Sequence, residues 1–141
     1  MYSNSAADTV LLRPTIPPNA DGVLSALRRA ADETGTDFDY LLTTAMRESS
    51  LNPKAKAASS SATGLFQFIE QTWLGTVKEF GGEHGLKTYA DAIEVGSNGR
   101  FRVADPAMRQ EILALRKDPK TAALMAGEMT NAVRGDMESA L

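Results

Sequence analysis

One carboxylate, Glu48, has a position that suits a general acid. At about 100° per residue along a helix, Glu48 lies one turn beyond Ala45 and two turns beyond Leu41, at the edge of an apolar stripe. It also belongs to the last helical turn, where the macrodipole disfavours a negative charge. Partial burial and this dipole both favour the neutral carboxyl, which is the form that donates a proton. The alternative is a solvated glutamate beside Arg47 with no chemical role.

A second polar side chain, Gln67, lies among large apolar residues in the segment Gly64-Leu65-Phe66-Gln67-Phe68. An amide is costly to bury without hydrogen-bond partners. Either backbone groups satisfy it, or it faces a cleft and binds a polar substrate that also stacks on aromatic rings. Sugars have both of these properties, so the second interpretation favours a saccharide substrate.

Composition removes several other kinds of chemistry. The chain has 141 residues, no cysteine and one histidine, His84, which excludes disulfides, thiolate nucleophiles and a zinc site with several histidine ligands. The balance of 15 Lys and Arg against 18 Asp and Glu gives a net charge of −3 and argues against a nucleic-acid partner. No run of about 18 apolar residues predicts a transmembrane segment. Catalysis by this chain would therefore use carboxylates, hydroxyls and amides.

The elements that position these residues are predicted to be helices, and the fold class is predicted to be all-α. Capping signals and apolar spacing predict helices over 22–34, capped by Asp21, and from 38 to the Asn52-Pro53 step. Residues 54–63 are small and polar and predict a loop in place of a sheet. Further helices are expected over 70–80 and from the two Asp-Pro steps at 105–106 and 118–119. No segment alternates for long enough to demand strands.

Residues 1–19 are predicted to form an extended, proline-rich arm, because Pro14, Pro17 and Pro18 are incompatible with a continuous helix. The arm lacks the basic and apolar regions of a secretory signal. Either a signal has been removed or export uses another route. Residues 20–141 are expected to be one domain.

Three segments together resemble a known family. Glu48-Ser49-Ser50-Leu51-Asn52-Pro53-Lys54-Ala55, Ser61-Ala62-Thr63-Gly64-Leu65-Phe66-Gln67 and Gln71-Thr72-Trp73 are similar to the motifs of the soluble lytic transglycosylase domain of the lysozyme-like superfamily, in its proteobacterial branch. The resemblance implies a lysozyme-like helical fold, cleavage of peptidoglycan glycan strands, a periplasmic or other extracytoplasmic location, and no metal or organic cofactor.

The resemblance also implies roles for single residues. Glu48 is the catalytic acid/base, and Ser49 orients the N-acetyl group or the polar surroundings of the reaction. Gln67 lines the saccharide cleft and Phe66 gives it an apolar wall. Two further positions are candidates for substrate contacts: Ser61, which replaces a glycine of the motif, and Tyr89, from a segment with a weaker resemblance.

The chain departs from the family pattern near its end. The family has a late tyrosine that faces the acid, whereas the last 25 residues here contain Asn131 and no tyrosine. We expect the domain to be shortened at its C-terminus.

Three activities stay open at this stage. Residues 59–63 hold no second acid, which favours a lytic transglycosylase that forms a 1,6-anhydro product with one glutamate. A hydrolytic muramidase would need a distant second carboxylate, for which the candidates are Glu70 first, and then Glu83, Asp91 and Glu94. A non-catalytic glycan-binding or scaffold module would instead dock to a cell-envelope or secretion-apparatus protein. A monomer is expected in each case.

Overall fold

The computed structural model describes residue 16 and residues 20–140, with side chains described as far as residue 135. The predicted arm over 1–19 therefore lies almost wholly outside the described residues. In chain order the elements are α2 (Asp21–Thr34), α3 (Phe38–Ser49), α4 (Glu70–Phe80), the 3₁₀ turn η1 (Gly81–His84), α5 (Lys87–Ala92), β1 (Ile93–Val95), β2 (Phe101–Val103), α6 (Pro106–Ala114), the 3₁₀ turn η2 (Leu115–Lys117) and α7 (Pro119–Ala140).

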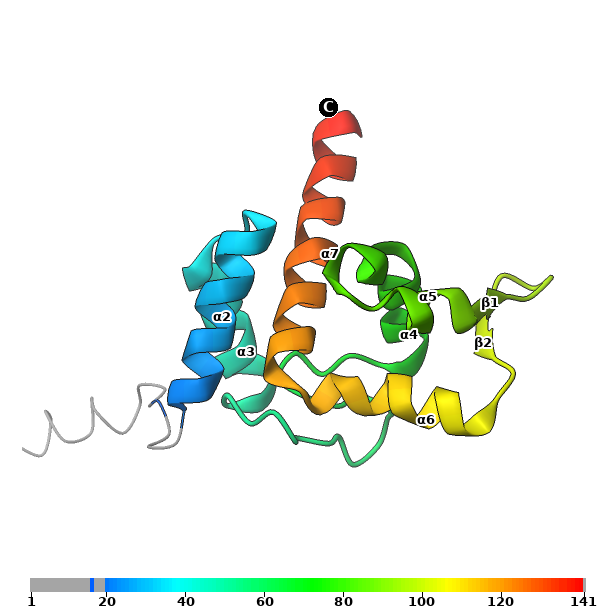
Figure 1. The fold of residues 1–141 in the computed structure, drawn as a ribbon. Coiled ribbons are helices and arrows are strands. Elements are labelled where there is room, and N and C mark those ends of the chain that lie inside the picture. The colour runs from blue at the N-terminus through cyan, green and yellow to red at the C-terminus, as the bar shows by residue number, and fades with distance from the viewer. Residues whose placement is uncertain (1–15, 17–19, 141) are drawn as a thin grey trace, which may run out of the picture.

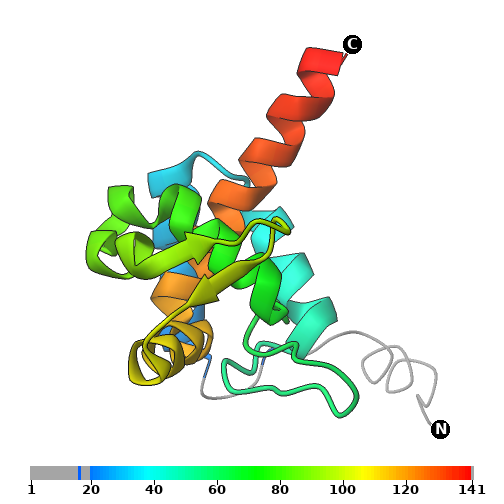
Figure 2. The same cartoon turned by 90° about the vertical axis from the view of Figure 1, so that its right-hand side faces the viewer.

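Helix α7 runs through the middle of the molecule. It has α2 and α3 on one side and α4 and α5 on the other, and its second half extends beyond them (Figure 1). The loop between α3 and α4 runs along the end of the molecule that lies opposite this extension (Figure 2). The predicted all-α class is confirmed, because the one sheet of the described residues is a two-stranded hairpin.

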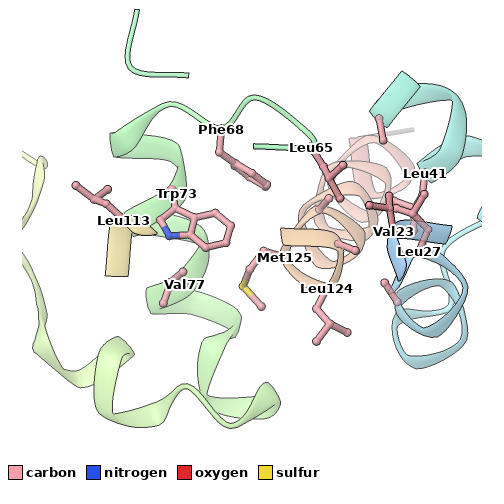
Figure 3. Close-up of a cluster of buried hydrophobic side chains, with 14 of the residues drawn as sticks. Val23, Leu27, Leu41, Leu65, Phe68, Trp73, Val77, Leu113, Leu124 and Met125 are labelled. Atoms are coloured by element: carbon pink, nitrogen blue, oxygen red, sulfur yellow. The ribbon is translucent and has the colours of Figure 1, made fainter. Parts of the chain in front are cut away.

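The core forms around Trp73, whose ring is fully buried. Phe68 packs edge-on against it with 4.9 Å between ring centroids, and Met125 and Val77 lie on its other sides (Figure 3). The indole Nε1 donates a hydrogen bond of 2.8 Å to the carbonyl of Ile112. A buried indole with a satisfied N–H fixes α4 against α6, and Phe68 brings the end of the long loop into the same core.

Local signals set most helix ends as expected. Asp37 and Asp105 accept hydrogen bonds from the N–H groups of Tyr40 and Ala107, so both act as N-caps. Helix α4 has the predicted bounds, and α6 and α7 begin at the two Asp-Pro steps. The predicted cap Asp21 is instead the first helical residue, because the N-cap position is taken by Ala20, which is buried in the core.

Two further predictions from the sequence were wrong. Helix α3 ends at Ser49 and does not continue to Asn52-Pro53, because Ser50 and Leu51 adopt left-handed φ values of 54° and 64°. Leu51 is buried, so core packing ends the helix two residues before Pro53 would disfavour it. The hairpin of β1 and β2 was also missed, since three-residue strands are too short to show alternation.

The predicted loop over 54–63 is confirmed. It contains no strand, and its ladder contacts are limited to two isolated bridges, Lys56 with Thr63 and Thr63 with Phe68. Thr63 is buried between these two partners, so the loop folds back on itself and then leads directly into the Gly64–Phe68 segment. A loop of small residues is thus held as a compact flap next to α4.

Close packing of α7 on α2 gives a first prediction. A Cβ on Gly127 would lie 2.4 Å from the Oγ1 atom of Thr34, so we expect Gly127→Ala to lower the free energy of unfolding by about 1–3 kcal/mol. Gly22, whose Cβ would meet nothing within 4 Å, is the matched control, and Gly22→Ala should be neutral or slightly stabilising. Urea denaturation of each variant measures both effects.

The Thr34→Ala background tests the cause. If the clash with the threonine side chain is responsible, Gly127→Ala will cost less in Thr34→Ala protein than in wild type. An equal cost in both backgrounds would contradict the proposed contact.

Candidate active site

Glu48 occupies the last turn of α3, as the sequence predicted. Its side chain is 40% exposed, so the carboxylate is accessible. The nearest cation is Arg47, whose Nε lies 3.9 Å from Oε2. An ion pair this long between exposed groups is weak. Glu48 is therefore an accessible carboxylate, without a strong partner among the described residues, at the negative end of a helix dipole.

Ser49 connects this helix end to the second motif. Its Oγ lies 2.7 Å from the carbonyl oxygen of Leu65 and 3.0 Å from that of Ala45, so the hydroxyl proton is shared between two backbone acceptors. The contact with Leu65 spans 16 residues of chain and places the Gly64–Phe68 segment beside the end of α3. The structure thus brings Ser49 and this segment together, and the direct role of Ser49 in substrate binding stays a prediction.

The amide of Gln67 is partly bonded to the backbone and partly free for a ligand, so each of the two interpretations from the sequence holds for one end of it. Its Nε2 donates to the carbonyls of Gly64 and Ala55, at 2.9 and 3.1 Å. Its Oε1 accepts no hydrogen bond within the described part of the chain and is not among buried unpaired atoms. The nitrogen end therefore braces the turn and the oxygen end remains free to accept a hydrogen bond from a ligand. Phe66 is half-buried next to it and packs against the outside of the core.

Ser61 and Glu70 are joined to each other. The Ser61 Oγ accepts the N–H of Glu70 at 3.1 Å, so it caps α4 from a distance, and Glu70 Oε1 lies 2.7 Å from Nη2 of Arg109. No hydrogen bond or ion pair among the described residues connects either side chain with Glu48. The role of Glu70 as a second carboxylate stays a prediction.

Tyr89 belongs to α5, which lies across α7 from α3 (Figure 1). The ring is half-buried against the core, and its hydroxyl is 3.5 Å from Glu111 Oε2 of α6. The role of Tyr89 in substrate binding stays a prediction.

Arg116 is a positioning residue that sequence reasoning missed. It is buried, and its guanidinium donates to three carbonyls: Nε to Leu113, and Nη1 to Ser61 and Phe68 at 2.7 and 3.0 Å. Burial lowers the pKa of this guanidinium, and the charge of Glu70 opposes that effect. The sequence held one signal of this burial: Arg116 directly follows the apolar residues 112–115 at the end of a helix. A charged side chain next to such a run is rarely buried unless it is paired.

Gly64 packs against the backbone of Arg116. Its φ of 90° suits glycine, and a Cβ at this position would lie 2.1 Å from the Arg116 carbonyl oxygen. No other residue type fits without moving one of the two backbones. The glycine of the motif is therefore required by a contact with the η2 turn.

Backbone strain is concentrated at this site. Among the described residues, the residues other than glycine with positive φ are Ser50, Leu51 and Gln67, and all three belong to the two motifs. Left-handed conformations in such residues cost free energy and persist where surrounding contacts enforce them. Here the Ser49 hydroxyl, the Arg116 guanidinium and the Gln67 amide supply those contacts.

Other hollows and clusters lie away from Glu48. A hollow of about 480 Å³ lies at the opposite end of α3, where Asp37 and Tyr40 face Met129 and Val133 of α7. Glu83, His84 and Glu128 form a group that could hold a metal ion, on η1 and α7. The hydrogen bond of 2.8 Å between His84 Nε2 and Glu128 accounts for its two less exposed members without an ion.

These features define a lysozyme-like helical domain with one accessible carboxylate beside a strained turn. Residues 25–98 match the model of the family described as the transglycosylase SLT domain, and the chain belongs to this family. Its members are lysozyme-like domains that generally cleave glycans and act on peptidoglycan. The match includes both motifs but ends before α6, η2 and α7, so Arg116 lies outside it.

The Gly64 contact gives a second prediction. We expect Gly64→Ala to destabilise the protein by at least about 3 kcal/mol, because it adds a backbone clash to the strain of a positive φ. Gly85 is the matched control: its φ is 79°, and a Cβ there would meet nothing within 4 Å. Gly85→Ala should cost about 1–2 kcal/mol from the conformation alone. Equal losses for the two variants in chemical denaturation would contradict a role for the Arg116 contact.

Proposed function

We propose that this protein is a peptidoglycan lytic transglycosylase that cleaves the β-1,4 bond between N-acetylmuramic acid and N-acetylglucosamine. The observation that carries the proposal is the connection between Glu48 and the strained Gly64–Phe68 turn through the Ser49–Leu65 hydrogen bond. This connection joins the end of the helix that carries Glu48 to the segment that carries Phe66 and Gln67, and an acid, an amide acceptor and an aromatic ring together suit a saccharide. Family membership supports the same substrate class.

The proposed reaction uses one carboxyl group in two roles. Neutral Glu48 donates its proton to the glycosidic oxygen as the bond to the muramyl C1 breaks. The N-acetyl oxygen of the same sugar stabilises the cationic centre intramolecularly. The resulting Glu48 carboxylate takes the proton of the sugar's 6-hydroxyl, whose oxygen bonds to C1. The product is a 1,6-anhydro sugar, and Glu48 regains the proton that it lost.

The ion pair of Glu70 supports this mechanism over hydrolysis. A muramidase with two carboxylates needs a second carboxylate that is available at the bond to be cleaved. The carboxylate of Glu70, the first candidate, is paired with Arg109, and its backbone N–H donates to the Ser61 hydroxyl. Its charge is thereby committed to holding α4 against α6.

One observation supports the alternative of a non-catalytic module. Asn131, the asparagine among the last 25 residues, donates to the carbonyl of Thr34 and accepts from the Thr36 hydroxyl. It thus ties α7 to α2 and is not directed at Glu48. A glycan-binding module could dock to a cell-envelope or secretion-apparatus protein, and this remains the second candidate.

A peptidoglycan substrate implies a periplasmic or other extracytoplasmic location, and we propose that the protein acts there as a monomer without a nucleic-acid partner. In the part of the chain that the structure describes, no helix is both long enough and apolar enough to cross a membrane.

Glu48→Gln tests the acid. The substitution keeps the volume and removes the transferable proton, so we expect loss of peptidoglycan clearing with unchanged binding of glycan oligosaccharides. Thermal stability should be equal or slightly higher, because a charge at the helix C-terminus is removed. Glu79→Gln is the matched control, since Glu79 is also exposed in the last turn of a helix. A Glu48→Gln protein that clears peptidoglycan at the wild-type rate would rule out this assignment.

Glu70→Gln distinguishes the two reactions. For a transglycosylase we expect nearly full activity and anhydro ends on the released muropeptides, measured by mass spectrometry. The loss of the half-exposed Arg109 pair should cost at most about 1 kcal/mol of stability. Reducing ends in the wild-type products, together with an inactive but folded Glu70→Gln protein, would instead establish a muramidase.

A further inference from the structure

A small polar hollow lies next to the candidate active site and is not used by the mechanism above. It has a volume of about 250 Å³ and is lined by the loop before Gly64, the start of α4, and the α6–η2 segment. Its charged and hydroxyl-bearing walls include Lys56, Ser61, Glu70, Arg109, Arg116 and Lys117.

Positive charge is concentrated here although the chain has a net charge of −3. Four cations, Lys56, Arg109, Arg116 and Lys117, surround the hollow, against one carboxylate, Glu70. Arg109 neutralises that carboxylate at 2.7 Å. Neither lysine ammonium group forms an ion pair or hydrogen bond among the described residues. The hollow therefore keeps an excess of positive charge that could attract an anion.

Arg116 extends this charge into the protein. Its Nε and Nη1 atoms are used on backbone carbonyls, whereas its Nη2 has no partner within the described residues and is not among buried unpaired atoms. Arg116 is among the residues that line the hollow, and its Nη2 is the guanidinium nitrogen left for a ligand there. Burial lowers the pKa of this group, and an anion bound beside it would favour its charged form.

The hollow and Glu48 share one loop. Ser49 holds the carbonyl of Leu65 from the side of α3, and Arg116 holds the carbonyl of Phe68 from the side of η2. These two carbonyls are three residues apart, a separation of at most about 10 Å. Peptidoglycan strands carry short peptides with free carboxylates on the lactyl group of the muramyl sugar. A five-residue peptide of this kind can span about 17 Å, which is enough to cross the loop.

We propose that this hollow is a subsite for a carboxylate of the stem peptide on the glycan strand. The inference rests on the proposed function, because it assumes that the strand binds at Glu48. Phosphate offers related chemistry, but the retained Glu70 carboxylate disfavours a dianion more than it disfavours a carboxylate.

The test uses a double variant, Lys56→Gln with Lys117→Gln, because both side chains are exposed and unpaired within the described chain and their loss should not affect folding. Lys120→Gln is the control, an exposed lysine of α7 outside the hollow. The probes are a synthetic stem pentapeptide, the same peptide with all its carboxylates amidated, and inorganic phosphate. Each is titrated into the full chain and followed by NMR chemical shifts.

We expect wild type and Lys120→Gln to bind the pentapeptide alike and the double variant to bind it about tenfold more weakly. The amidated peptide should not bind. Equal binding of the pentapeptide by the double variant, or undiminished binding of the amidated peptide, would overturn the proposal. Phosphate that binds more tightly than the peptide, at the same lysines, would also overturn it and identify the hollow as a phosphate site.

Cleavage separates this inference from the proposed function. On peptide-bearing strands the double variant should lose about tenfold in kcat/KM, and on strands stripped of peptide by an amidase it should equal wild type. If wild type cleaves both substrates and the double variant matches it on both, the subsite is wrong and the function stands. If wild type cleaves neither substrate, the proposed function fails, and the binding titration still decides whether the hollow takes a carboxylate.

Discussion

The backbone contact between Gly64 and Arg116 is the constraint on which the candidate site depends. With no Cβ on Gly64, the loop approaches the η2 turn closely enough for the Arg116 guanidinium to reach the carbonyls of Ser61 and Phe68. Those bonds hold the chain shortly before Gly64 and at Phe68, and the Ser49 hydroxyl holds the carbonyl of Leu65 between them. The segment can therefore keep a strained conformation that its own residues would not choose.

This arrangement explains why the polar side chains near Glu48 have structural partners. Ser49, Gln67 and Ser61 each use a hydrogen-bonding group to fix backbone, and Gln67 keeps one acceptor for a ligand. A catalytic carboxyl benefits from surroundings that are rigid before substrate arrives, because little reorganisation is then needed in the transition state. The site is built from many small positioning contacts around one accessible acid.

The carboxylates are divided between the two sides of the loop. Glu48, on the side of α3, has only a long contact with Arg47, whereas Glu70 is held by Arg109 and by its backbone cap. Pairing commits the charge of Glu70 to the architecture, whereas the carboxyl group of Glu48 is accessible and has one weak ion pair. The excess of cations around Glu70 also gives the far side of the loop a distinct, anion-attracting character.

The sequence by itself determined the helical class, the cap at Asp105, and the motifs that contain Glu48 and Gln67. These features depend on local spacing and on side chains that bond their own backbone, so they are readable without knowledge of the fold. The same locality explains why the loop over 54–63 and the bounds of α4 were predicted correctly.

Only the tertiary structure decided how these pieces meet. The burial of Leu51 ended α3 early, and the buried Ala20 displaced the expected cap at Asp21. In the folded chain Ser61 caps the N–H of Glu70, and both residues contact arginines of the α6–η2 segment. Arg116 binds carbonyls that lie about 50 residues away in the sequence. Contacts at that separation depend on how the helices pack around Trp73 and α7. This packing cannot be predicted from the spacing of residues along the chain.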